Sequence, residues 1–177
     1  YKAVKIAQPD FFVIENVKGM LTLNKGAFVK DILKRFGEDG LGYTISMQLL
    51  NAADYGVPQN RQRVFFIGIK GKSFQFPEKS TSIITCSDAI SDLIGADSNH
   101  YGCESQNDYQ RLMRKGCLKP HNQDYTSHTE QTISIISRIP DGGNIKCLPR
   151  EFWEVRKYNK AFERMNSQRP SNTIDTG

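Results

Sequence analysis

The chain has 177 residues, four cysteines and a net charge of +5. This length suits one domain, or one and a part, with its own core. No apolar run approaches the ~18 residues of a membrane helix, which excludes that class, and widely spaced cysteines favour a reducing compartment over a disulfide framework. The mild positive charge favours nucleic acid only modestly as a partner, because an ordinary solvated surface carries such charge too.

The two ends of the sequence give a further expectation. The chain begins at Tyr1 and closes on "RPSNTIDTG" without a polar tail. It opens without the charged and then apolar leader of a secretion signal. We expect both ends to be cut from a longer protein.

Residues 1–76 have the pattern of alternating strands and a helix. The short apolar run 11–14 is typical of a strand buried on both faces. Helical spacing predicts a helix over 27–36, with Asn24 as its cap. Strands are expected over 43–50 and 64–69. Strand, helix and strand predict an α/β layer with a partly parallel sheet.

The remainder, beyond a boundary at 77–82, is predicted to be largely helical. Helices are expected over 85–93, 105–116 and 127–139. Each begins with a possible capping box, and the pairs are Thr85 with Asp88, Ser105 with Asp108, and Ser127 with Glu130. Residues 145–168 have a mixed pattern that predicts no single element.

Polar residues stand where two predicted strands begin or end. Glu15 and Asn16 directly follow the first strand, and ligands of α/β sheets lie outside the carboxyl ends of strands. Arg61 and Arg63 lie two apart before the last strand, so an extended backbone points both side chains the same way. The alternatives are that Glu15 caps the coming loop or pairs with a lysine, and that the arginines lie on a solvated edge.

Two longer motifs resemble those of DNA cytosine-5 methyltransferases. "PDFFVIENVKGM" is similar to the family's strand ending in Glu-Asn-Val, and "NAADYGVPQNRQRVFFIG" is similar to its Gln-x-Arg-x-Arg motif, in the same order about forty residues apart. "SDAISDL" resembles the segment that follows, and "RPSNTIDTG" resembles the start of the Arg-Pro-Ser-x-Thr motif. The resemblance covers 1–95 and 169–177, on either side of a variable region.

This resemblance implies a fold and a setting. It implies part of a Rossmann-like methyltransferase sheet in 1–76, a linker and mixed α+β target-recognition region in 77–168, and the start of the return to the catalytic domain in 169–177. The implied source is a bacterial, cytoplasmic restriction–modification enzyme. Its implied cofactor is S-adenosylmethionine in the parent enzyme, and its partners are double-stranded DNA and the missing parts of the same enzyme, with no membrane.

The family's chemistry implies roles for five residues. A cysteine thiolate adds to C6 of a flipped cytosine, so that C5 takes a methyl group. By resemblance, Glu15 protonates or hydrogen-bonds N3, Arg63 stabilises the charge on O2, and Arg61 holds the nearby site. Asn16 and Gln59 are implied to support the site structurally.

Other family motifs are absent from this sequence. None of the four cysteines follows a proline and all lie after Glu15, so we nominate none as the nucleophile. The glycine pair Gly40 and Gly42 leads into a strand, unlike a cofactor loop. We expect no cofactor binding and no methylation by this chain alone. The alternatives are a truncated or split DNA-binding module without catalysis, and an unrelated α/β protein.

Weaker signals lie in the later segments. Six bases are candidate DNA contacts, although solvated faces explain them as well: Arg111, Arg114, Lys115, Arg150, Arg156 and Lys157. Three aromatic residues accompany the last of these as a candidate stacking surface, or more simply as core: Trp153, Tyr158 and Phe162. Two cysteines and two histidines are conceivable zinc ligands: Cys103, Cys117, His121 and His128. Their spacing fits no compact pattern, so we expect no metal.

Overall fold

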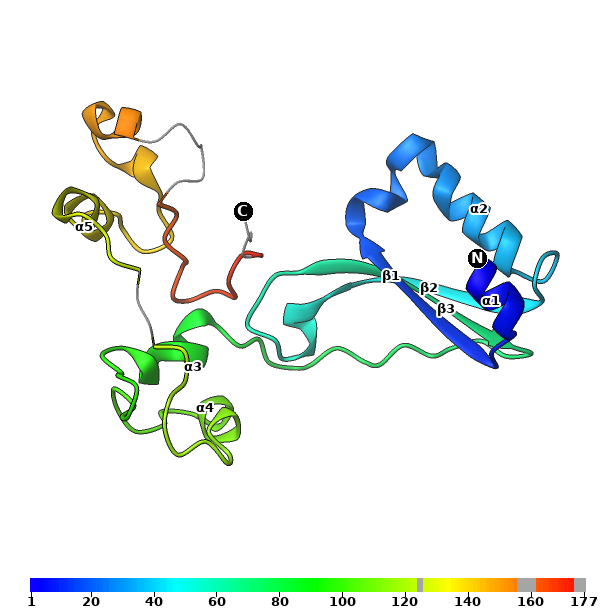
Figure 1. The fold of residues 1–177 in the computed structure, drawn as a ribbon, viewed down its shortest axis with the longest axis horizontal. Coiled ribbons are helices and arrows are strands. Elements are labelled where there is room, and N and C mark those ends of the chain that lie inside the picture. Colours follow the sequence, from blue (N-terminus) through cyan, green and yellow to red (C-terminus); the bar gives the residue numbers. More distant parts are fainter. Residues whose placement is uncertain (124–125, 156–161, 174–177) are drawn as a thin grey trace. The chain divides into compact units, whose positions relative to one another are not determined.

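The structure is a computed structural model that describes residues 1–123, 126–155 and 162–173 (Figure 1). Its internal contacts divide the chain into two units. Unit 1 comprises residues 1–55 and 61–81, and unit 2 comprises 56–60 and 82–177. Within the described residues, none of the helices is long and apolar enough to cross a membrane.

Unit 1 is built on a three-stranded sheet, with helices alongside it (Figure 1). Its strands are β1 (Phe11–Val17), β2 (Tyr43–Asn51) and β3 (Gln62–Lys70), in the order β1-β3-β2. Both neighbouring pairs are antiparallel, so the expectation of a partly parallel sheet was wrong for the described strands. The short link between β2 and β3 holds only a 3-10 turn (Ala52–Tyr55), whereas a parallel crossover needs a dozen or more residues.

The core of unit 1 lies between the sheet and its helices α1 (Lys2–Ala7) and α2 (Ala27–Phe36). The Phe12 ring lies 5.0 Å from the rings of both Phe36 and Tyr43. Gly68 stands opposite Phe12 in the ladder, and a Cβ there would overlap the Phe12 ring. The missing side chain therefore lets Phe12 lie across β3 and close the core.

The start of α2 differs from the predicted cap. Asn24 and Lys25 are left-handed, with φ of 47° and 55°, inside the 3-10 segment η2 (Leu23–Gly26). The N-cap of α2 is Gly26, whose own φ of 78° suits glycine. A further 3-10 segment, η1 (Lys18–Leu21), joins β1 to η2. The chain thus turns sharply after β1 before the helix begins.

The extended segment that follows β3 is bonded to β2 and to the turn after β2. The Phe74 N–H donates to Ser46 Oγ at 2.9 Å, and the Ser80 N–H donates to the Asp54 carbonyl at 2.7 Å. The Lys79 ammonium also pairs with Asp54 at 2.7 Å. These contacts bond the segment to β2 and to the 3-10 turn that follows β2.

Unit 2 is largely helical, with α3 (Cys86–Ile90), η4 (Ser91–Leu93), α4 (Asp108–Met113), α5 (Glu130–Ser137), η5 (Ile145–Cys147) and η6 (Arg150–Val155). The capping box of Thr85 and Asp88 is confirmed. The other two helices begin later than predicted. Their N-caps are Asn107 and Thr129, whose side-chain oxygens accept from the backbone N–H three residues ahead, so neither Ser105 nor Ser127 is a cap.

The segment preceding Arg61 is bonded to the end of the described chain. Gln59 and Ser171 form a parallel bridge, the Asn60 N–H donates to the Ser171 carbonyl at 2.8 Å, and the Ser171 N–H donates to the Pro58 carbonyl at 2.9 Å. The Thr173 hydroxyl also donates to the Asn60 carbonyl at 3.0 Å. These bonds explain why residues 56–60 belong to unit 2.

Candidate active site

Three strand ends meet at one edge of the sheet in unit 1. The last residue of β1, Val17, stands opposite Arg63 at the beginning of β3. Near the end of β2, Leu50 stands opposite Arg63 on its other side. The carboxyl ends of β1 and β2 therefore lie together with the residues that enter β3, at the edge where ligands of α/β proteins bind.

Glu15 and Arg63 meet at this edge. Arg63 Nε lies 2.8 Å from Glu15 Oε1. The two residues are diagonal neighbours on one face, because Glu15 stands opposite Phe65, two residues beyond Arg63. Arg63 Nη1 donates to the Gln62 carbonyl at 2.9 Å, so the guanidinium is held from two sides.

The solvent exposure of the Glu15–Arg63 pair determines how much the ion pair contributes to stability. The Glu15 side chain is 48% exposed and the Arg63 side chain 20% exposed. An ion pair this open to water contributes about 1 kcal/mol or less to stability. Its main effect is orientation: a carboxylate and a guanidinium lie side by side with part of each still open to a ligand.

Arg61 does not form the ion pair with Glu15. It lies just before β3 with an exposed side chain, and its carbonyl accepts from the Ala52 N–H at 3.0 Å. That bond fixes the backbone that leads into β3. The ion pair with Glu15 is formed by Arg63 rather than Arg61.

The two expected supporting residues make other contacts. Asn16 points to the opposite face of β1 from Glu15, and its Oδ1 accepts from the Val17 N–H at 2.8 Å. Gln59 belongs to unit 2, where it bridges to Ser171. Neither side chain has a contact with Glu15 among those the structure shows for the described residues, so their supporting role stays a prediction.

Two features of this sheet edge were not predicted from the sequence. Phe65 lies directly beside Glu15 on β3 and is half-buried, so an aromatic side chain borders the carboxylate. An apolar hollow of about 500 Å³ lies at the end of β1, lined by Asn16, Val17, Gly19, Met20, Leu23 and Phe28. The non-periodic apolar residues of "KGMLTLNKGAF" were the available signal for the hollow, while Phe65 required the strand register.

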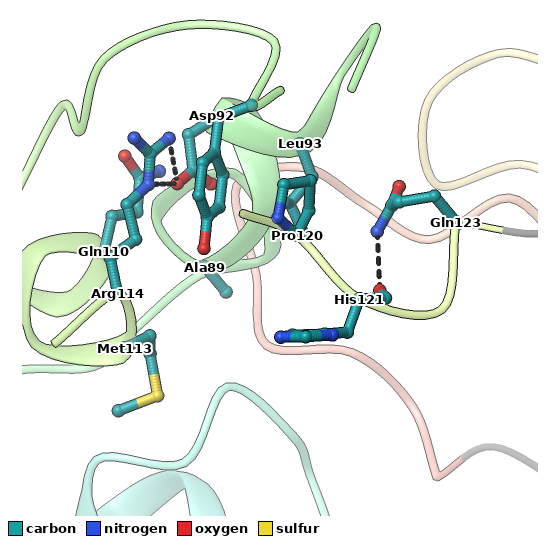
Figure 2. Close-up of a pocket in the computed structure, with 10 residues that line it drawn as sticks. Ala89, Asp92, Leu93, Gln110, Met113, Arg114, Pro120, His121 and Gln123 are labelled. Carbon is teal, nitrogen blue, oxygen red and sulfur yellow. Dashed lines mark hydrogen bonds and ion pairs between the residues drawn. The ribbon is translucent and has the colours of Figure 1, made fainter. Parts of the chain in front are cut away.

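Arg114, a predicted DNA contact, is bonded inside unit 2 (Figure 2). Its Nε and Nη2 lie 2.8 and 2.7 Å from Asp92 Oδ2, and Nη2 also donates to the Cys103 carbonyl at 2.6 Å. Its guanidinium stacks 3.6 Å from the centroid of the Tyr101 ring. Asp92 is buried. Arg114 therefore neutralises a buried carboxylate, a structural role that the sequence did not predict.

The other predicted DNA contacts vary in position. Arg111 is exposed and pairs with Asp108 at 2.5 Å, and Lys115 is exposed in the turn after α4. Arg150 lies over the Trp153 ring at 5.8 Å. Arg156, Lys157 and Tyr158 lie outside the described residues. Phe162 is half-buried in a hollow beside Ile139.

Two weaker expectations concern a metal site and a cofactor loop. In the described part of the chain, no three His, Cys, Asp or Glu side chains gather as metal ligands. The Gly40 and Gly42 N–H groups both donate to the Gly37 carbonyl, at 2.9 and 3.0 Å. Their amides are used to close the turn after α2, so this turn does not fit a cofactor loop.

The fold resembles that of a solved structure. An E. coli prophage protein described as a DNA modification methyltransferase has a similar structure. The TM-score is 0.69 at 20% identity, over 97% of this chain and 54% of that one. At this identity the match shows a shared fold alone.

Sequence comparison then identifies the family. The model of the C-5 cytosine-specific DNA methylase family matches residues 1–175, so the chain belongs to this family. It is 35% identical over 164 residues to the Type II methyltransferase M.DdeI of Desulfomicrobium norvegicum, covering 84% of this chain and 39% of that protein. It is 32% identical over 172 residues to M1.HphI of Haemophilus parahaemolyticus, covering 96% and 41%. The chain thus spans about two-fifths of the relatives it matches.

Proposed function

We propose that this chain is the central part of a bacterial, cytoplasmic DNA (cytosine-5-)-methyltransferase of a restriction–modification system. The complete enzyme would transfer a methyl group from S-adenosylmethionine to C5 of a flipped cytosine in double-stranded DNA. The observation that carries this proposal is the 2.8 Å contact between Glu15 and Arg63 at the strand edge. Family membership supplies the reaction class.

The chemistry of the cytosine ring suits this pair. N3 and O2 are adjacent on one edge of the base, so a carboxyl group and a guanidinium side by side match them. In the proposed complex, Glu15 carries a proton and donates it to N3, while Arg63 donates to O2. Both contacts stabilise the charge that the ring gains when a nucleophile adds to C6. Phe65, beside Glu15, limits the access of water from the β3 side.

The methyl donor and the nucleophile are assigned to other parts of the enzyme. S-adenosylmethionine supplies the methyl group in this family's chemistry, and the turn at Gly40 and Gly42 does not fit it. Arg61 is proposed to hold the surrounding site, with Asn16 and Gln59 in support. On this view the chain alone neither binds the cofactor well nor methylates DNA.

The region assignments are part of the same proposal. Residues 1–76 would belong to a Rossmann-like catalytic sheet, 77–168 to a linker and target-recognition region, and 169–177 to the return to the catalytic domain. The partners would be DNA and the rest of the same enzyme. A DNA-binding module without catalysis is the second candidate, and the retained pair of Glu15 and Arg63 favours the enzyme.

The test compares the full-length enzyme with its Glu15→Gln variant. Methyl transfer from labelled cofactor should fall by about 10² or more, since a general acid is lost, while DNA affinity stays within about threefold. Glu38→Gln, which removes an exposed carboxylate after α2, is the matched control and should keep full activity. A fall of less than about fivefold, ~1 kcal/mol in barrier, excludes Glu15 as the N3 partner.

The isolated chain provides the second arm of the test. Purified chain should bind duplex DNA without transferring label, because it carries neither the nucleophile nor the cofactor loop. Methyl transfer by the chain alone would contradict the proposed division of labour. A full-length protein that binds DNA and never transfers methyl would establish the binding-module alternative.

A further inference from the structure

Exposed apolar and basic residues occur together along α4 and the turn that follows it in unit 2. Leu112, Met113 and Leu118 are 62%, 54% and 98% exposed. Lys115 and Lys119, in the same short stretch, are exposed as well. Single exposed apolar residues are ordinary on protein surfaces, whereas several in one structured segment mark a candidate interaction surface. We call these five residues the α4 surface.

The backbone that carries the α4 surface is fixed from inside unit 2. The Arg114 side chain is bonded to the buried Asp92 and to the Cys103 carbonyl (Figure 2). The Cys117 N–H donates to the Arg114 carbonyl at 2.8 Å, and Pro120, just after the surface, is buried. The exposed side chains are therefore held on a structured turn before a partner binds, so that binding costs little backbone entropy.

The charges of this stretch favour an anionic partner. Residues 109–121 contain four Lys and Arg side chains and no acid. The two arginines have carboxylate partners, and no carboxylate of the described residues forms an ion pair with Lys115 or Lys119. Such lysines bind phosphate groups. Duplex DNA presents phosphates beside an apolar base stack, so it suits both kinds of side chain. An anionic membrane offers the same two features, and family membership favours DNA.

Phosphate binding does not explain Leu118. An apolar side chain can contact a thymine methyl group, which covers part of it, or enter the base stack, which covers all of it. Almost the whole Leu118 side chain is open to a partner. We propose that Leu118 is a wedge that inserts between two stacked base pairs of the substrate duplex, while Lys115 and Lys119 bind nearby phosphates. This inference rests on the proposed function, because it takes duplex DNA as the substrate.

The wedge gives Leu118 a role in choosing the DNA site. A leucine makes no hydrogen bond to a base edge, so it reads how easily a step unstacks. Pyrimidine–purine steps such as TA and CA unstack most easily. We therefore expect the recognition site to contain such a step where Leu118 inserts. Leu118 is then a specificity-determining residue that acts through the deformability of the duplex.

The test uses the full-length enzyme and a duplex that carries its site. The site is located by sequencing the plasmid fragments that the enzyme retains on a filter, which does not depend on methyl transfer. The fluorescent base 2-aminopurine then replaces adenine at successive positions, because its emission rises when it unstacks. One position should brighten about twofold or more with the wild type, and Leu118→Ala should abolish that rise. Leu118→Ala should also bind about tenfold more weakly, because most of the inserted apolar surface is lost.

Three control variants separate insertion from phosphate binding and from folding. Leu118→Met keeps a long apolar side chain and should keep the rise in fluorescence. Lys115→Gln should also keep the rise, while it lowers the slope of log affinity against log salt by about 1; Leu118→Ala should keep the wild-type slope. Ile133→Ala truncates a 55% exposed residue of α5 and should behave as the wild type does. The urea midpoint of each variant is compared with that of the wild type.

The outcomes distinguish the wedge from the proposed function. The wedge is overturned if Leu118→Ala binds and unstacks the duplex as the wild type does, or if Ile133→Ala loses as much. It is also overturned if the enzyme retains no DNA and instead floats with phosphatidylglycerol vesicles. If the wild type unstacks the duplex through Leu118 and transfers no methyl group, the wedge stands and the proposed function fails. If methyl transfer occurs and no position depends on Leu118, the proposed function stands and the wedge fails.

Discussion

The ion pair of Asp92 and Arg114 allows one prediction to be worked in detail. The two side chains are 4% and 17% exposed, and the guanidinium also stacks on Tyr101. Arg114→Leu would leave the Asp92 carboxylate buried without its cation. Removing one partner of a buried pair costs about 3–5 kcal/mol, and the partial exposure of Arg114 places the expected loss near ~3 kcal/mol.

Arg111, three residues earlier in α4, provides a matched control. Its pair with Asp108 has side chains that are 57% and 99% exposed, so Arg111→Leu should cost about 0.5 kcal/mol or less. Both variants replace arginine by leucine, so the difference between them reports the contacts of the Arg114 guanidinium with Asp92, the Cys103 carbonyl and Tyr101. The variant Asp92→Asn/Arg114→Leu should recover much of the loss, because no buried charge remains.

The assay is urea unfolding followed by the fluorescence of Trp153, the single tryptophan, which lies in unit 2. Duplex DNA binding is measured in parallel at several salt concentrations. Arg111→Leu should weaken DNA binding and reduce the salt slope by about 1 if Arg111 contacts a phosphate. The reasoning is refuted if Arg114→Leu costs less than about 1 kcal/mol, or no more than Arg111→Leu does.

Two further predictions concern the core of unit 1 and the loss of stability at low pH. Gly68→Ala should destabilise unit 1 by about 1–3 kcal/mol in urea, because its Cβ overlaps the Phe12 ring; Gly19→Ala, with open space at its Cβ, should be nearly neutral, and equal effects would contradict the account. Hydrogen bonds from the Ser167 hydroxyl and N–H lower the pKa of Asp141. Its contribution is therefore present above pH ~4 and is lost as the pH falls through the lowered value; Ser167→Ala should raise the Asp141 pKa in an NMR titration, and an unchanged value would show that the hydroxyl bond is not formed.

The sequence was enough to predict that Glu15 and Arg63 lie near each other, because strand geometry is regular. Alternation along β1 and β3 fixes which side chains share a face, and the motif order places Glu15 and Arg63 at the same edge. The antiparallel register that makes them diagonal neighbours was not accessible, because it depends on the pairing of β3 between the other two strands. The same register put Phe65 beside Glu15.

The orientation of α4 shows why unit 2 was harder to predict. The apolar residues Leu112 and Met113 of α4 are both exposed. The buried residue is Gln110, whose side chain donates to Ser91 Oγ at 2.8 Å and accepts from the Gln106 N–H at 2.6 Å. Such polar burial depends on a partner 19 positions away and leaves no periodic signal in the sequence.

The bonds between residues 58–60 and Ser171 have a practical consequence for dissecting this chain. Because 56–60 belong to unit 2 while the residues on both sides of them belong to unit 1, the polypeptide passes between the units three times. A shortened chain ending near residue 81 would lack Ser171, so the short loop ahead of Arg61 would lose its backbone hydrogen-bond partner. Neither unit can therefore be isolated as a continuous piece of sequence without loosening the approach to β3.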